Sequence, residues 1–201
     1  MSLKDKFSDR GPWFTTNSGV HFYLFDPKQD EVRIQDIATH LSVLTRFGGA
    51  LGVPYTVGHH SLIMSYIAQY RRWDPIEAFI CLMHDATEAY VGDVVRPFKQ
   101  ALPEVKEAEK NVADIIGEKY GIILHPLEPD IDMLDKRICK HEAGYFELST
   151  DGWSDPAFRD LTPFTENEQL IFVKYAEMEP NSVRKRFLKQ FHNLYTEVHG
   201  L

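Results

Sequence analysis

The sequence predicts an all-α protein, a single helical bundle that follows a short irregular or β-like segment. From Ile34 onward, apolar residues recur every three or four positions in seven separate stretches, which is the spacing of one helix face. Start and stop signals, such as Pro in a first turn and Gly after a last one, separate these stretches at short intervals. The length of 201 residues suits one domain, 1–201.

The first thirty residues lack helical spacing. The stretch GPWFTTNSGVHFYLFDP is rich in Gly, Pro and aromatic residues, with a β-like run at His21–Phe25 and a turn at Asp26-Pro27. A first helix is then predicted to end at Gly48-Gly49, with one apolar face formed by Ile34, Ile37, Leu41 and Leu44.

The second and third helices have well-defined patterns. The second begins near Val57 and carries His60 on the same side as Met64 and Ile67. The third has the clearest start, because Asp74 can act as N-cap, Pro75 takes the first helical position and Glu77 completes a capping-box spacing. We expect this helix to run through IEAFICLMHDATEAY to Gly92.

Four further helices complete the prediction. The fourth follows Pro103 and ends at Gly121, and the sixth opens with a capping-box spacing from Thr165 to Glu168. The last starts after Pro180. The inward positions are Val105, Ala108, Val112 and Ile115 in the fourth helix, Ile131, Leu134, Asp135, Ile138 and Glu142 in the fifth, and Val183, Phe187, Leu194 and Val198 in the last.

Composition narrows the function classes. A net charge of −8 argues against a general binder of nucleic-acid polymers or anionic membranes, and it suits a protein that handles a small anion in one focused site. The two cysteines form no disulfide framework, which favours the reducing cytoplasm. We expect no membrane span, because no apolar run of about 18 residues appears, and no export signal.

Polar residues interrupt the third helix where packing should be densest. His84, Asp85 and Glu88 crowd one region of its surface, and buried charges are costly unless they are paired or bind a metal. His60 and Asp135 also occupy core positions of their helices. Two imidazoles and two carboxylates form a mixed set of ligands suited to one divalent transition metal, namely Mn, Fe, Co, Ni or Zn.

Cationic residues surround this predicted metal site. The stretch VGDVVRPFK places Asp93, Arg96 and Lys99 just beyond Gly92, and TRFGG places Arg46 at the end of the first helix. Beside a metal, such cations are typical of phosphate binding.

These residues resemble a known family. His60, His84-Asp85 and Asp135 are similar to the H…HD…D signature of the HD-domain metal-dependent phosphohydrolases. LTRFGG, YTVGHHSL, MHDATEAYVGDVVRPFK and LDKRICKHEA occur in the order seen in bacterial 5′-deoxynucleotidases and phage deoxynucleoside triphosphohydrolases. The resemblance covers roughly Asp26 to Leu148. It implies the HD-domain fold, with a catalytic core at 31–148 between a non-helical segment at 1–30 and C-terminal helices at 149–201.

The resemblance also implies roles for single residues. His60, His84, Asp85 and Asp135 would hold the metal. Glu88 would orient or deprotonate the attacking water, and Asp93 would be a second acid/base group near the sugar or the leaving oxygen. The substrate-binding residues would be Arg46 and Lys99 for phosphate, Phe47 for the sugar and Pro97 for the base end. His59 departs from the pattern, because many relatives have Glu there, and we expect it to lie outside the ligand set or at the surface.

The function predicted from this resemblance is a 5′-deoxynucleotidase that releases phosphate from deoxynucleoside monophosphates. A triphosphohydrolase that releases triphosphate from a dNTP would use the same residues, with Arg71, Arg72 and Arg96 as candidate extra cations. A di-iron oxygenase would need His59 as a further ligand. A non-catalytic nucleotide sensor would have no use for Glu88 and Asp93. The family also implies a homo-oligomer, a dimer or larger.

Overall fold

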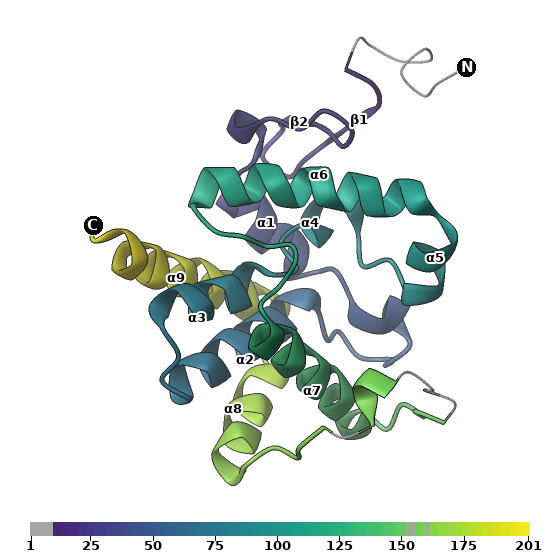
Figure 1. The fold of residues 1–201 in the computed structure, drawn as a ribbon, viewed down its shortest axis with the longest axis vertical. Helices are drawn as coiled ribbons and strands as arrows, with labels where there is room; N and C mark the ends of the chain where they lie inside the picture. Colours follow the sequence, from purple (N-terminus) through teal and green to yellow (C-terminus); the bar gives the residue numbers. More distant parts are fainter. Residues whose placement is uncertain (1–9, 152, 154–155, 160) are drawn as a thin grey trace.

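The computed structural model describes residues 10–151, 153, 156–159 and 161–201, and the side chains at 96, 97, 100 and 157 fall outside the description. Over these residues the fold is mostly α-helical, with one two-stranded antiparallel sheet at the N-terminal end (Figure 1), as predicted. The helices are α1 Ile34–Leu41, α2 Val57–Tyr70, α3 Pro75–Met83, α4 Glu88–Val91, α5 Arg96–Ala101, α6 Pro103–Tyr120, α7 Pro129–Tyr145, α8 Glu166–Ala176 and α9 Pro180–His199. The 3₁₀ turns are η2 Gln29–Glu31, η3 Arg46–Gly49 and η4 Pro156–Phe158.

Helix α2 forms the centre of the bundle. Its side chains are buried around almost the whole helix, which is expected of a helix with neighbours on every side. It packs against α1, α3, α7, α8 and α9. One hydrophobic core surrounds it, including Ile37, Met64, Phe79 and Phe187. The first turn of α2, which carries His60, therefore lies deep in the protein.

The N-terminal hairpin covers one edge of the bundle, beyond α6 (Figure 1). Strands β1 Trp13–Thr15 and β2 His21–Tyr23 pair antiparallel, so the predicted β-like run is confirmed over its first three residues. Phe22 is fully buried and stacks on Tyr90 with ring centroids 3.9 Å apart. The buried carboxylate of Asp36 accepts hydrogen bonds from the Ser18 backbone N–H and hydroxyl, which fixes the hairpin to α1.

The first helix ends earlier than the sequence predicts. Helix α1 stops at Leu41, and Thr45 is extended and forms an isolated bridge with Thr56. Arg46 and Phe47 lie in η3 rather than at a helix end. Phe47 has a φ of 55°, a left-handed conformation that a right-handed α-helix does not contain. The predicted helix to Gly48-Gly49 was therefore wrong beyond Leu41.

The third predicted helix is interrupted. Helix α3 ends at Met83 and α4 begins at Glu88, with a tight turn over residues 84–87. The Cys81 carbonyl accepts a hydrogen bond from His84 Nδ1, so it is diverted from the regular helix ladder. The next backbone hydrogen bond spans three residues instead of the four of an α-helix, because the Ala86 N–H donates to the Met83 carbonyl. The short helix α5 in the VGDVVRPFK region was not predicted.

The capping signals of the sequence are confirmed. Thr165 and Glu168 form a reciprocal capping box, in which Thr165 Oγ1 accepts from the Glu168 N–H and Glu168 Oε2 accepts from the Thr165 N–H. Glu77 accepts from the Asp74 N–H at the start of α3. Gly121 ends α6 in the left-handed region, with φ of 69°. In the described part of the chain, no helix combines the length and apolar character needed to cross a bilayer.

Gly117 is predicted to be required for the turn after α6. A Cβ at this position would lie 2.5 Å from the Ile122 carbonyl oxygen, a backbone atom that cannot move aside easily. We expect Gly117→Ala to lower the free energy of unfolding by about 1–3 kcal/mol, which thermal denaturation would register as a midpoint about 2–4 °C lower per kcal/mol.

The matched control for this substitution is Gly144→Ala in α7, where an added Cβ meets nothing within 4 Å. There the change should leave stability equal or slightly higher, because Ala favours the helix. A midpoint for Gly117→Ala at or above that of the control would contradict the close approach described above.

Candidate metal centre

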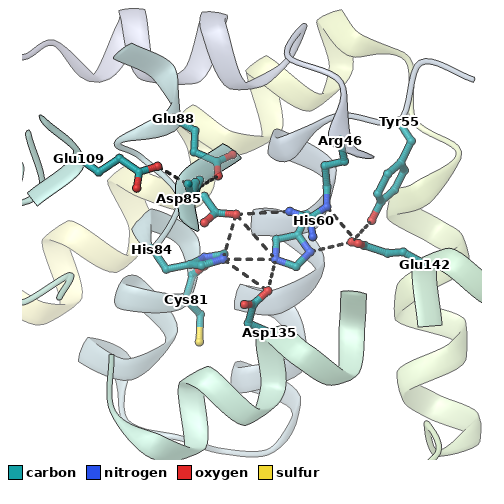
Figure 2. Close-up of polar contacts among 11 residues, drawn as sticks. Arg46, Tyr55, His60, Cys81, His84, Asp85, Glu88, Glu109, Asp135 and Glu142 are labelled. Atoms are coloured by element: carbon teal, nitrogen blue, oxygen red, sulfur yellow. Dashed lines mark hydrogen bonds and ion pairs between the residues drawn. The ribbon is translucent and has the colours of Figure 1, made fainter. Parts of the chain in front are cut away.

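Four side chains from three separate segments converge, namely His60, His84, Asp85 and Asp135 (Figure 2). His60 Nε2 lies 3.2 Å from His84 Nε2 and 3.0 Å from Asp135 Oδ1, and His84 Nε2 lies 3.1 Å from Asp85 Oδ2. His60, His84 and Asp135 place ligand atoms within 4.8 Å of one another. Asp85 extends this group through its contact to His84. All four predicted metal ligands are therefore brought together.

The contacts of the imidazoles indicate which nitrogens face the centre. His60 Nδ1 lies 2.6 Å from Glu142 Oε1, and His84 Nδ1 lies 2.9 Å from the Cys81 carbonyl oxygen. Both oxygens accept hydrogen bonds, so each Nδ1 donates. The two Nε2 atoms then point lone pairs at each other and at two carboxylates. Such an arrangement requires positive charge at its centre, either a proton or a metal ion.

The donor set fits a divalent transition metal. Ligand bonds of about 2.0–2.2 Å place neighbouring ligand atoms about 3 Å apart, which is the spacing from His60 Nε2 to His84 Nε2 and to Asp135 Oδ1. Neutral imidazole with carboxylate suits Mn, Fe, Co, Ni or Zn. His60 is fully buried, whereas the Asp85 and Asp135 side chains are 21% and 32% exposed. A small molecule could therefore approach from the carboxylate side.

The electrostatics of the cluster favour a cation. Burial opposes ionisation of Asp85, but His84, His60 and Arg46 outweigh it and hold the pKa of Asp85 well below its usual range. The pKa of Asp135 is also lowered, against the effect of burial, by His60 and His84. Burial and Arg46 oppose protonation of His60, yet Glu142 and Asp135 raise its pKa to about 9. The surrounding carboxylates therefore stabilise positive charge between the two rings.

Arg46, which was predicted to bind phosphate, lies against the cluster. Its Nε donates to Glu142 Oε2 at 3.0 Å, and its Nη1 lies 3.4 Å from Asp85 Oδ2. The Arg46 side chain is only 11% exposed. Its guanidinium is therefore held next to the cluster, with its Nη1 directed toward Asp85 (Figure 2).

Glu88 is buried above Asp85 with an unpaired oxygen (Figure 2). Its Oε1 is 3.5 Å from Lys99 Nζ, but among the described residues its buried Oε2 has no hydrogen-bond partner. Burial, together with the charges of Asp85 and Asp93, raises the pKa of Glu88 well above its usual value. A buried polar atom without a protein partner is usually satisfied by water or by a ligand. Glu88 is thus placed to exchange a proton with such a group.

Lys99, Asp93 and Phe47 lie near Glu88, Asp85 and Arg46. Lys99 on α5 is 2.7 Å from Glu109 Oε1 as well as near Glu88. Asp93 is half-buried, and burial raises its pKa although Arg46 opposes this. The half-buried Phe47 ring lies near Arg46, 5.4 Å from its guanidinium carbon. A bulky residue in the left-handed region is strained, a condition that clusters at functional sites.

Three predicted residues have different outcomes. The side chains of Pro97 and Arg96 lie outside the described residues, so their roles stay predictions. His59 does lie outside the ligand set, but it is not at the surface: it is 1% exposed, and its ring contacts the Thr56 hydroxyl and the Met178 carbonyl oxygen.

Glu142 contacts His60 and Arg46 of the site, and Tyr55 contacts Glu142; neither residue was predicted to take part from the sequence. Glu142 is fully buried and accepts hydrogen bonds from the Tyr55 hydroxyl at 2.7 Å, from His60 and from Arg46. Arg46 and His60 outweigh the effect of burial and lower the pKa of Glu142 to about 2. Its place on the apolar face of α7, seven residues after Asp135, was the available signal.

Comparison with known proteins leaves the activity open. Over 108 residues the chain is 43% identical to the uncharacterized protein YfdR of Escherichia coli, a match that covers 53% of this chain and 57% of that protein. Over 200 residues it is 24% identical to an uncharacterized protein of Rhodobacter capsulatus, covering 94% of this chain and 98% of that protein. The chain thus spans little more than half the length of the E. coli relative. No family model matches it.

Proposed function

We propose that this protein is a divalent-metal-dependent phosphohydrolase of the HD-domain type. The observation that carries the proposal is the convergence of two imidazole nitrogens and two carboxylates on one point, with Arg46 and the unpaired Glu88 carboxylate beside it. A cation-binding centre, a buried proton acceptor and a guanidinium are the groups that hydrolytic phosphoryl transfer requires.

The residues of the site would bind the metal, transfer protons or bind the substrate. His60, His84, Asp85 and Asp135 would hold a divalent ion, which when bound supplies charge neutralisation at phosphoryl oxygens and increases the acidity of water. Glu88 would accept the proton of the attacking water. Arg46 would bind the phosphoryl oxygens, and Lys99 would join it once released from Glu109. Asp93 would donate a proton to the leaving oxygen, and Phe47 would pack against the sugar.

The proposed substrate is a deoxynucleoside monophosphate, with free phosphate as a product. Arg71, a candidate for binding distal phosphates of a dNTP, is held by the buried Glu168 carboxylate, with its Nε 2.8 Å from Oε1. It also lies just beyond the end of α2, about 16 Å along the helix from His60. Among the described residues, Arg46 contacts Asp85 and Lys99 contacts Glu88, and two such cations suit one phosphate better than three.

A product analysis tests this assignment. Protein loaded with Mn²⁺ or Co²⁺ would be incubated with deoxy- and ribonucleoside mono- and triphosphates, and the products separated by chromatography. We expect free phosphate from deoxynucleoside monophosphates, with ribonucleotides cleaved at least about tenfold more slowly, a selectivity of about 1.4 kcal/mol. Released triphosphate would instead establish dNTP triphosphohydrolysis. Intact substrates with every metal would contradict the proposal.

An oxygenase and a sensor have less support than a hydrolase. A di-iron oxygenase would need a further imidazole ligand, and His59 is turned away toward Thr56 and Met178. A nucleotide sensor only binds its ligand and needs no general base, so it does not account for the buried Glu88 carboxylate. Homo-oligomer assembly and a cytoplasmic location remain predictions of the sequence.

A further inference from the structure

We infer that Glu142 is a positioning residue that sets the orientation of both His60 and Arg46, and so links the metal ligands to the phosphate-binding side of the site. The inference concerns the metal centre first, and only its Arg46 part rests on the proposed function. It goes beyond the ligand set, because Glu142 itself makes no contact with the point where the ligands converge.

The hydrogen bonds of Glu142 divide between its two oxygens. Oε1 accepts from His60 Nδ1 at 2.6 Å and from the Tyr55 hydroxyl at 2.7 Å, while Oε2 accepts from Arg46 Nε at 3.0 Å (Figure 2). An ionised carboxylate only accepts, so all three partners must donate. With zero exposure, water cannot replace any of these bonds.

The contact with His60 determines which nitrogen is available to a metal. Because Nδ1 donates to Glu142, the Nε2 lone pair faces His84 and Asp135. A carboxylate behind a ligating imidazole fixes the ring and increases its basicity, and loss of such a partner weakens metal binding by about 10–100-fold. His84 has a backbone carbonyl in the same position, so of the two imidazoles His60 is the one that depends on a side chain.

The contact with Arg46 fixes the second half of the site. Binding of Nε to Glu142 leaves Nη1 on the side of Asp85, and under the proposed function the phosphate would bind there. Asp135 and Glu142 come from the same helix, two turns apart, so α7 supplies both a ligand and this support. A shift of Glu142 would therefore disturb His60 and Arg46 together.

Glu142→Gln is the direct test, because the amide keeps the shape but presents a donor where a carboxylate oxygen accepted. We expect Co²⁺ affinity, measured by competition with a chromophoric chelator, to fall about 10–100-fold. The visible absorption of bound Co²⁺ should change, and KM for the nucleotide should rise. Glu177→Gln is the matched control, because Glu177 accepts from the Tyr145 hydroxyl at the surface, 2.9 Å away. Glu177→Gln should match the wild type in Co²⁺ affinity, in the visible absorption of bound Co²⁺ and in KM for the nucleotide.

Tyr55→Phe separates positioning from general stability. It removes one hydrogen bond to Glu142 but leaves His60 and Arg46 in place, so it should lower the melting temperature with Co²⁺ affinity near that of the wild type. Equal weakening of Co²⁺ binding in Tyr55→Phe and Glu142→Gln would overturn the inference, as would unchanged affinity in Glu142→Gln. If Glu142→Gln fails to fold, Glu142→Asp keeps the charge but withdraws the carboxylate by one methylene from His60 and Arg46, and the same loss of affinity is expected.

A measurement without metal keeps this inference distinct from the proposed function. In the proton NMR spectrum of the metal-free wild type, His60 Nδ1–H should give a strongly downfield, slowly exchanging signal that Glu142→Asp lacks. If the wild type binds no metal, the proposed function fails, and this signal still decides whether Glu142 holds His60. Its absence from the wild type would overturn the inference by itself.

Discussion

Asp135→Asn should abolish tight metal binding and reduce phosphate release by at least about 10³-fold. Asp135 Oδ1 lies 3.0 Å from His60 Nε2 and is one of two carboxylates that supply negative charge to the centre. The amide retains the shape but loses the charge that a divalent ion requires, and metal-dependent charge stabilisation contributes several kcal/mol to such reactions. Metal content by mass spectrometry and phosphate release would be measured on the same preparations.

Asp132→Asn is the matched control for this variant. Asp132 lies on the same helix, one turn earlier, and pairs with Lys136 at the partly exposed surface of α7. Because surface ion pairs contribute little, about 0–1 kcal/mol, the control should bind metal and release phosphate like the wild type. Full metal occupancy in Asp135→Asn would contradict the ligand assignment, whatever the activity.

Glu88→Gln should separate catalysis from metal binding. We expect phosphate release to fall about 10²–10⁴-fold, the usual effect of losing a general base, with metal affinity close to that of the wild type. The exposed Glu107 on α6 provides the control variant Glu107→Gln. Wild-type activity in Glu88→Gln would remove Glu88 from the reaction, and loss of the metal would identify it as a ligand instead.

The same substitution should raise the stability of the metal-free protein. Burial beside Asp85 and Asp93 raises the pKa of Glu88 in the folded state above its unfolded value of about 4.5. A raised carboxyl pKa means that the folded state binds the proton more tightly, so stability falls as pH increases above about 4.5 until the folded-state pKa is passed. Glu88→Gln removes this dependence. Chemical denaturation of the metal-free protein should therefore show that Glu88→Gln increases the free energy of unfolding more at pH 8 than at pH 5.

Much of the fold could be predicted from the sequence because local signals and tertiary packing agree. The helices that begin at Pro75, Pro103 and Pro180 do so in the structure, and the Thr165–Glu168 box forms as its spacing indicates. The errors lie at the site. Helix periodicity extended the first and third helices through Arg46 and His84, where the backbone leaves regular helix geometry to place these side chains.

The convergence of the four predicted ligands could be anticipated from the sequence, whereas the side chains that support them could not. His60, His84, Asp85 and Asp135 were conspicuous because charged or ionisable groups at inward helix positions need a partner. Glu142 occupied such a position too, but its partners Tyr55 and Arg46 lie in irregular segments before α2, and no helix or strand period relates them to α7. The pairing of Lys99 with Glu109 also depends on the short helix α5, which has no apolar period to reveal it.

The most direct test is a metal titration of the stripped protein with a deoxynucleoside monophosphate as substrate. We expect no phosphate release from metal-free wild type, a rise with Mn²⁺ or Co²⁺ that saturates near one ion per chain, and loss of that rise in Asp135→Asn but not in Asp132→Asn. Phosphate release that is independent of added metal, or equal in the two variants, would show that the convergent His60, His84, Asp85 and Asp135 are not the centre of a metal-dependent hydrolase.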